Sequence, residues 1–147
     1  MEFMEKLCSA RNKKSCFKID IIKMKKRKFP EAYIKHGKRV LHSGQISNIF
    51  YDVNALLTNP SAQMYILDNI PESKYYVGIA TGGAIIAGLM AKITGAHFSM
   101  IKDRELKSTF SIRDDWILID DVVTTAKSLE DAIQIIGKKP PRIFVVL

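Results

Sequence analysis

The sequence has 147 residues, of which 47% are hydrophobic and 26% charged, and its formal net charge is +8. This length and composition predict one soluble globular domain with a substantial core, and they exclude a membrane-spanning helix because no apolar stretch reaches the roughly 18 residues that a span needs. The two cysteines lie near the N-terminus without metal-ligand companions, which favours free thiols in a reducing compartment and therefore a cytoplasmic protein.

The excess positive charge lies at the beginning of the chain. Residues 1–28 hold ten Lys or Arg against three Asp or Glu, whereas residues 29–147 are nearly neutral. We therefore expect residues 1–28 to form a flexible basic leader and residues 29–147 to form the folded domain, with translation from Met24 as a further hypothesis. A nucleic-acid-binding arm is disfavoured, because no aromatic residue is interleaved with the basic cluster at residues 23–28.

The first predicted elements of the domain are short. A helix is expected over residues 29–34 and should end by Gly37. Two strands follow, at residues 39–42 and 49–53, with a turn between them. We expect residues 30–58 as a whole to form a small β-rich hood.

The core, expected over residues 60–147, begins with a helix that Asn59 caps. Residues 75–79 then predict a strand that continues through a glycine-containing connection into a second helix. Paired glycines at such a place let backbone N–H groups approach a phosphate, although close packing of the helix on the strand would explain them equally well. The connection consists of Ala80, Thr81, Gly82 and Gly83.

Further strands are predicted at residues 97–102 and 142–147, and the polar residues 102–115 predict a mobile surface loop. Strands that alternate with helices predict an α/β fold in which a mostly parallel sheet is flanked by helices. In such sheets ligands bind beyond the carboxyl ends of the strands. The hood would cover that edge.

The most specific signal lies in residues 116–130. An apolar strand at residues 116–119 ends at two adjacent acids, Asp120 and Asp121, and a hydroxyl-rich turn leads into an amphipathic helix at residues 127–136. The turn could hold a phosphate and the acids could bind sugar hydroxyls or a hydrated Mg²⁺, so a phosphorylated sugar would suit both. An ordinary capped helix after a buried strand is the alternative. The residues of the turn are Thr124, Thr125, Ala126, Lys127 and Ser128.

This stretch resembles the PRPP (5-phosphoribosyl-1-pyrophosphate) signature of the type I phosphoribosyltransferases, which is an apolar strand, two acids, two aliphatic residues and Thr-x-Gly-x-Ser/Thr. Ala126 stands in place of the signature's glycine. Three other segments, residues 41–52, 78–83 and 101–103, are similar to orotate phosphoribosyltransferase in order and spacing. The resemblance covers about residues 30–147 and implies the same fold.

The resemblance also implies roles for individual residues. Asp120 and Asp121 would hold the ribose hydroxyls, Lys102 would bind pyrophosphate, and Lys107 is a stand-in for the lysine of the catalytic loop. Residues 80–83 would form the pyrophosphate loop, and the hydroxyl-rich turn would form the 5′-phosphate loop. Beside the base the resemblance places His42, Phe50 and Tyr51, although aromatic residues in a strand are also common as core or cross-strand contacts.

The activity that the resemblance implies is transfer of ribose 5-phosphate from PRPP to a nucleobase, with release of pyrophosphate. With orotate the product is orotidine 5′-monophosphate, in pyrimidine nucleotide synthesis. The resemblance further implies a homodimer, a loop at residues 103–115 that closes over the site, and Mg²⁺ that enters with PRPP and water rather than on direct protein ligands.

Four departures from the family pattern bear on this activity. His42 replaces a lysine, Ile101 replaces an arginine, the loop after Lys102 is short, and the family continues beyond residue 147 to an arginine that recognises the orotate carboxylate. Two alternatives therefore stay open: a PRPP- or nucleotide-binding regulatory protein with impaired catalysis, and a phosphoribosyltransferase for a different base.

Overall fold

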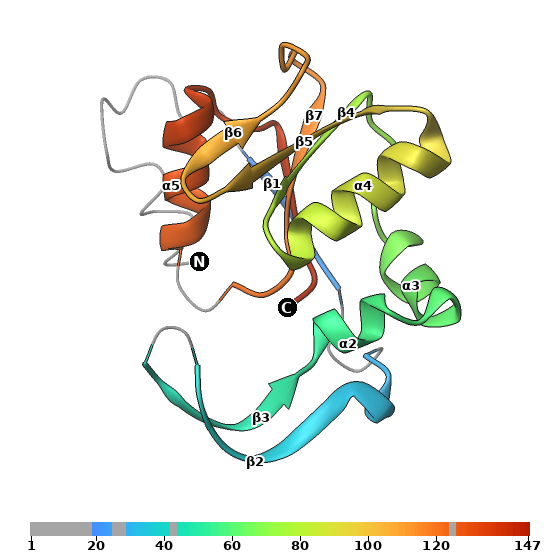
Figure 1. Ribbon diagram of the computed structural model, residues 1–147, viewed down its shortest axis with the longest axis vertical. Helices are drawn as coiled ribbons and strands as arrows, with labels where there is room; N and C mark the ends of the chain where they lie inside the picture. Colours follow the sequence, from blue (N-terminus) through green and yellow to red (C-terminus); the bar gives the residue numbers. More distant parts are fainter. Residues whose placement is uncertain (1–18, 25–28, 42–43, 124–125) are drawn as a thin grey trace.

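Figure 1 shows the computed structural model, which describes residues 19–24, 29–41, 44–123 and 126–147. A six-stranded sheet forms its centre, in the order β1-β8-β7-β4-β5-β6. All neighbouring strands are parallel except β6, which is antiparallel to β5. The strands are β1 (Asp20–Lys23), β4 (Tyr75–Ile79), β5 (His97–Lys102), β6 (Glu105–Lys107), β7 (Trp116–Asp120) and β8 (Arg142–Val145).

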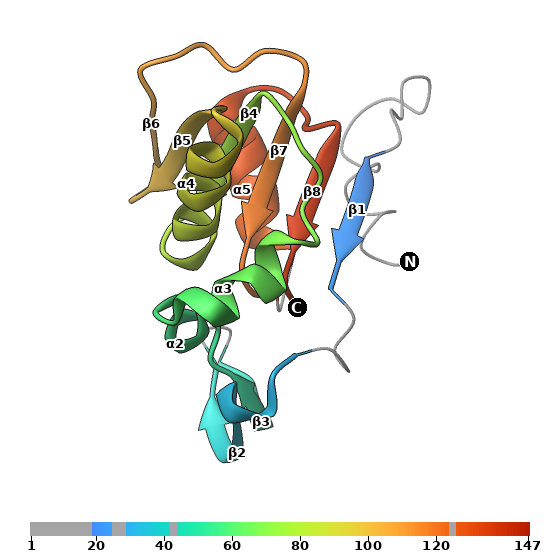
Figure 2. The same cartoon turned by 90° about the vertical axis from the view of Figure 1, so that its right-hand side faces the viewer.

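Helices cover both faces of this sheet (Figures 1 and 2). One face packs against α2 (Val53–Leu57), α3 (Pro60–Leu67) and α4 (Gly82–Thr94), and the other packs against α5 (Lys127–Ile136). Alternate residues of β7 enter the two cores, Ile117 on the α4 side and Leu118 on the α5 side, and both are fully buried. Burial on both sides explains why β7 is a continuous apolar run, and the predicted α/β architecture is confirmed.

A second, two-stranded sheet lies beyond the carboxyl edge of the first. Its antiparallel strands are β2 (Ile34–Val40) and β3 (Ile46–Tyr51), which follow the short 3-10 helix η2 (Glu31–Tyr33). In Figure 2 the arrowheads of β1, β7 and β8 point toward this hairpin. The helix predicted at the start of the hood is thus a single 3-10 turn. Gly37 ends no helix but lies inside β2 with a φ of 120°, where the strand register shifts.

The central sheet begins earlier than the charge pattern suggested. Residues 20–23, which we assigned to the basic leader, form the edge strand β1 beside β8, and the flanking Ile19 and Met24 are buried. Basic residues around a short apolar run hid this strand in the sequence. A chain that began at Met24 would lack it. The two cysteines and the remaining leader residues lie outside the described part of the chain.

The segment after β5, predicted to be a mobile surface loop, begins with a hairpin strand instead; its mobility stays a prediction. Asp103 and Arg104, at φ of 51° and 61°, make a two-residue turn of the kind that joins tight hairpins, and β6 then pairs with β5. Residues 108–115 then contact several parts of the fold. The Ser99 and Ser108 hydroxyls are 2.6 Å apart, the Phe110 ring centroid is 4.2 Å from that of His97, Lys138 donates to the carbonyl of the buried Ile112, and Arg142 pairs with Asp115 at 2.9 Å.

Among the residues placed by the structure, no helix is both long enough and apolar enough to cross a membrane.

Candidate functional site

Two strand-to-helix loops leave the same edge of the central sheet. Strands β4 and β7 are parallel neighbours with Gly78 opposite Ile119, so the loops that follow them emerge side by side. We call residues 80–83 the glycine loop and residues 120–123 the acid loop. β5 ends next to them at Lys102, and the Ala80 N–H donates to the carbonyl of Ile101 at 2.9 Å. Three segments that the sequence singled out are thus brought to one edge.

The acid loop and the end of β7 pack closely against the two glycines of the glycine loop. A Cβ atom on Gly83 would lie 2.4 Å from the carbonyl oxygen of Ile119, and one on Gly82 would lie 2.3 Å from Oδ2 of Asp121. Real Cβ atoms do not approach so closely. Gly83 therefore requires glycine for packing against backbone, whereas a side chain on Gly82 would displace the Asp121 carboxylate. Close packing was one of the two explanations that the sequence left open.

Helix α4 begins inside the glycine loop. Gly82 and Gly83 are its first residues, the Ala80–Thr81 peptide bond is cis, and the Thr81 side chain makes no capping hydrogen bond to any described residue. The first N–H groups of an α-helix have no partner within the helix, so such an end can receive an anion. The glycine loop is therefore suited to a phosphate as well as to packing.

The two acids occupy different environments. Asp120 is only 5% exposed; its Oδ1 accepts the N–H of Asp121 at 2.9 Å, and its Oδ2 accepts the Ser128 hydroxyl at 3.1 Å. Burial, followed by the neighbouring charge of Asp121, raises the pKa of Asp120 to about 7. Asp121 is half-buried and lies against Gly82. The acid loop is also tied to the chain end, since Leu147 donates to the Asp121 carbonyl at 3.2 Å and accepts from Val123 at 3.0 Å.

The start of α5 is a second helix end at this edge of the sheet. Ala126, its N-cap residue, has φ −67° and ψ −10°, which is ordinary right-handed backbone, so this position needs no glycine for its conformation. Its side chain makes no capping hydrogen bond, and among the described residues the first N–H groups of α5 are suited to an anion. Lys127 and Ser128 are exposed, whereas Thr124 and Thr125 lie outside the described residues.

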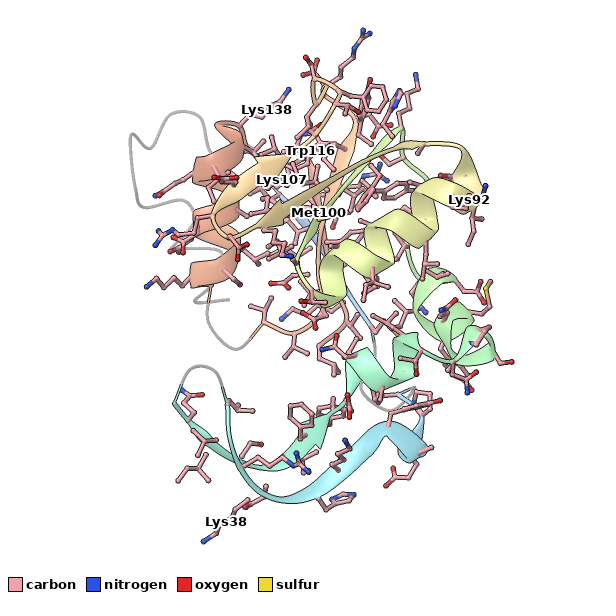
Figure 3. All side chains as sticks on the ribbon, viewed as in Figure 1. Lys38, Lys92, Met100, Lys107, Trp116 and Lys138 are labelled. Carbon is pink, nitrogen blue, oxygen red and sulfur yellow. The ribbon has the colours of Figure 1, made fainter. Side chains whose placement is uncertain are left out.

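The two predicted lysines are placed very differently. Lys102 is exposed at the end of β5, next to the glycine loop. Lys107 lies on β6 opposite Met100 and forms an exposed ion pair with Glu105, which raises its pKa (Figure 3). Three strand spacings separate β6 from β7, about 14 Å. The structure therefore does not bring Lys107 to the acids.

The predicted base-binding aromatic residues do not form a pair. Phe50 and Tyr51 are neighbours on β3, and neighbouring residues of a strand point to opposite faces. The Tyr51 ring meets Phe29 edge-on at 5.2 Å and packs against the core, while the Arg39 guanidinium lies 5.3 Å from the centroid of Phe50. Tyr51 is therefore a core contact, which was the alternative to a place beside the base. His42 lies outside the described residues.

Several site features were missed from the sequence. The hydrogen bond between Ser128 and Asp120 spans eight residues, and only the folded turn reveals it. Arg39 lies three residues before His42 and carried no signal of its own. A depression of about 450 Å³ also opens between α4 and β5, beside the glycine loop. It is lined mainly by apolar side chains and bordered by Lys102 and Thr81. Predicting that these residues lie together requires the order and register of the strands, which the sequence does not give.

Comparisons with known proteins agree with this geometry. The chain is 29% identical over 133 residues to an orotate phosphoribosyltransferase of Pyrococcus abyssi (strain GE5 / Orsay), covering 78% of this chain and 73% of the relative. It is 28% identical over 110 residues to the enzyme of that name from Lactobacillus johnsonii, covering 63% and 51%. The crystal structure of orotate phosphoribosyltransferase from Aeropyrum pernix matches with a TM-score of 0.64 at 24% identity, over 78% of this chain and 74% of that chain. No protein-family model matches the chain.

The parallel sheet with its flanking helices, and the small antiparallel hairpin formed by residues 34–51 beyond its carboxyl edge, define the fold of the type I phosphoribosyltransferases. The fold expected from the resemblance is thereby confirmed. Among proteins with this fold, the chain resembles the orotate phosphoribosyltransferases and is a divergent relative of them, at 29% and 28% identity to two of them.

Proposed function

We propose that this chain binds PRPP and transfers its ribose 5-phosphate to a nucleobase, with orotate as the first candidate, releasing pyrophosphate. The observation that carries this proposal is the meeting of the glycine loop and the acid loop at one sheet edge, where Asp121 fits against Gly82. Two anion-accepting helix ends, separated by carboxylates, match a ligand with phosphates at both ends of a sugar. The names of the curated relatives point to the same reaction.

In this proposal each segment has a distinct task. The glycine loop and Lys102 would bind pyrophosphate, the acid loop would hold the ribose, and residues 124–128 at the start of α5 would hold the 5′-phosphate. Displacement at the anomeric carbon passes through a cation-like sugar, which a nearby carboxylate stabilises. The departing pyrophosphate gains charge, which N–H groups and the Lys102 ammonium neutralise. Phe50 and the hood would lie on the side of the base.

We propose Mg²⁺ as the cofactor, carried in by PRPP. Within the described ranges no group of three or more His, Cys, Asp or Glu side chains could hold a metal ion by itself. Mg²⁺ keeps several waters and is commonly bound through substrate phosphates, so the ion would reach this site with PRPP and water rather than on direct protein ligands. When bound, the ion would neutralise charge on the pyrophosphate group.

The test is pyrophosphate release from PRPP and Mg²⁺ by purified protein, with orotate, uracil and purine bases in separate reactions. Release that depends on orotate supports the proposal, and release that depends on another base keeps the reaction and changes the substrate. The Asp121→Asn variant is the matched control, because contaminating activity would survive it. Folded protein that releases no pyrophosphate with any base contradicts the proposed catalysis.

One observation favours a second candidate, a PRPP-binding regulatory protein with impaired catalysis. A water-sensitive intermediate needs a segment that closes over it, and the candidate segment is short, with residues 105–107 paired to β5 and residues 108–115 in contact with the rest of the fold. Calorimetry with PRPP and Mg²⁺ separates the two functions. Binding without release under any condition supports the regulatory protein, whereas binding with base-dependent release supports the enzyme.

We also propose that the active form is a homodimer, as the resemblance implies. Light scattering coupled to size-exclusion chromatography measures the mass directly. A monomer at every concentration that supports activity would contradict the dimer without affecting the proposed reaction.

A further inference from the structure

The hairpin of β2 and β3 is attached to the rest of the protein at one end. Residues 35–40 of β2 are all exposed, whereas Ile34 and Tyr51, which are cross-strand partners, pack against the main core. We call Ile34, Tyr51 and the adjoining Asp52 the hairpin root. Figure 2 shows that the hairpin projects beyond the carboxyl edge of the central sheet. Its direction is therefore set at the root.

Asp52 is the residue at which the polar contacts of the root meet. It is the N-cap of α2, and its Oδ1 accepts the Ala55 N–H at 3.0 Å. Its own N–H donates to the carbonyl of Tyr33, just before β2, at 2.8 Å. Its Oδ2 accepts the ammonium of Lys35 on β2. One residue thus joins both ends of the hairpin to the first helix that follows it.

The ion pair between Lys35 and Asp52 is partly shielded from water. The Asp52 side chain is 18% exposed and that of Lys35 is 46% exposed. The hydrogen bond from Lys35, followed by that from the Ala55 N–H, lowers the pKa of Asp52, so the carboxylate is charged at neutral pH. A pair of this exposure contributes modestly to stability. Its larger effect is on the geometry of the root.

The same ion pair lies beside Phe50. Lys35 is the direct cross-strand partner of Phe50, and such partners extend from the same face of an antiparallel pair. Asp52 follows Phe50 by two residues, and the Arg39 guanidinium lies 5.3 Å from the centroid of the Phe50 ring. A rotation of the hairpin about its root would therefore carry the Phe50 ring with it.

We propose that Lys35 and Asp52 form a clamp on the hairpin root and act as positioning residues, which hold Phe50 where a planar base can lie against it. This inference rests on the proposed function, in which Phe50 and the hood lie on the side of the base. Neither Lys35 nor Asp52 contacts the base in this proposal. They act through the direction of the hairpin.

Four variants separate the clamp from the helix cap. Lys35→Met removes the ammonium and keeps an unbranched stem, and Asp52→Asn removes the charge while keeping an oxygen that can cap α2. Asp52→Ala removes the ion pair and the cap together. Lys38→Met is the matched control. Lys38 is an exposed lysine of the same strand, it forms no ion pair with another described residue, and it points away from the rest of the molecule (Figure 3).

The first arm needs no ligand and measures hydrogen-exchange protection of the residue-52 amide, which donates to the Tyr33 carbonyl. Lys35→Met and Asp52→Asn should each lower protection about two- to fivefold, as expected for a partly exposed ion pair. The double variant should lose no more than either single variant, because both remove one interaction. Asp52→Ala should lose about tenfold or more, since the cap is lost too. A loss in Lys35→Met no larger than in Lys38→Met would overturn the clamp.

The second arm measures steady-state kinetics with the base that supports pyrophosphate release, orotate first, and PRPP affinity by calorimetry. Lys35→Met and Asp52→Asn should raise the KM for the base about two- to fivefold, the effect of losing a partly exposed ion pair. The kcat and the PRPP dissociation constant should stay within about twofold of wild type, because only the position of the base is affected. A purely structural pair would lower protection and leave this KM unchanged, and that result would overturn the positioning role.

The control and the wild type separate the remaining outcomes. A KM increase in Lys38→Met equal to that in Lys35→Met would assign the effect to lost positive charge and overturn the clamp. Wild-type protein that releases no pyrophosphate with any base would overturn the proposed function, and with it the positioning of a base. The exchange measurements would still decide whether Lys35 and Asp52 hold the hairpin root.

Discussion

At the scale of single residues, the site depends on two glycines, which have no Cβ atom. Gly82 and Gly83 leave the space into which Asp121 and the backbone of β7 fit, so the two loops can approach to contact distance. Gly88, six residues past Gly82 in the same helix, is different. A Cβ there would meet only the Phe98 ring, at 3.7 Å, which is ordinary contact.

Gly83→Ala should therefore destabilise the fold by about 1–3 kcal/mol or more, because the added methyl group overlaps the carbonyl of Ile119. Gly88→Ala is the matched control, and it should stabilise the protein by about 0.5–1 kcal/mol, because alanine favours helix. Urea unfolding of both variants measures the difference. Similar midpoints for the two would show that the close approach of helix and strand is not what Gly83 provides.

Asp120 should make stability depend on pH in a direction unusual for an acid. Its pKa is about 7 in the folded protein and near 3.9 when unfolded, so the folded state binds the extra proton between these values. Stability from this residue is therefore lost as pH rises from about 4 to about 7. Urea midpoints measured across that range should fall less steeply in Asp120→Asn than in wild type. Parallel profiles would place the titrating group elsewhere.

At the scale of elements, the segment after β5 is an edge strand followed by a strap, residues 108–115, that contacts several parts of the fold. Its contacts come from four different places in the fold: Ser99 and His97 on β5, Ser73 before β4, Lys138 after α5, and Arg142 on β8. Attachments this widely spread suit a segment that stabilises the sheet.

Removing the Phe110 ring should release the middle of this strap. In Phe110→Ala the contact with His97 is lost, and trypsin should cut after the exposed Arg113 faster than in wild type. Mass spectrometry of the fragments assigns the site, and Arg113→Gln in the same background is the control that should remove the cut. Equal cutting rates would mean that the other attachments hold the segment without Phe110.

The sequence predicted the parts of this fold that carry strong periodic or apolar patterns. β5, β7 and α5 were expected within a residue of their observed bounds, because burial on two faces or on one helix face leaves a clear pattern. β1 and β6 were missed because each is short and has only one or two apolar residues among charged ones. The opposite orientation of Phe50 and Tyr51 could have been predicted from the sequence, since side chains alternate along a strand. The hydrogen bond between Ser128 and Asp120 could not, because it depends on the path of the turn.

At the scale of the whole molecule, the first described strand completes the sheet. β1 covers the edge of β8, and the residues on either side of it, Ile19 and Met24, are 7% and 6% exposed. An uncovered β8 would present unpaired backbone groups next to apolar side chains, which is the usual start of edge-to-edge association.

Deleting residues 1–24 should therefore lower stability by at least about 3 kcal/mol, from two buried side chains alone, and should promote aggregation. Deleting residues 1–18 is the control that keeps β1. Thermal melts followed by light scattering compare the two proteins. If both melt at the wild-type temperature, β1 contributes little and the domain is complete from residue 25.

The contact between Asp121 and Gly82 has a thermodynamic meaning beyond packing. Two loops that fill each other's space cannot shift independently, so a ligand that moves one changes the free energy of the other. If one loop receives pyrophosphate and the other a phosphorylated sugar, the affinities for the two fragments are linked, and the linkage is the same from either side. A ligand that carries both groups would then bind with a free energy that differs from the sum of the binding free energies of its two halves.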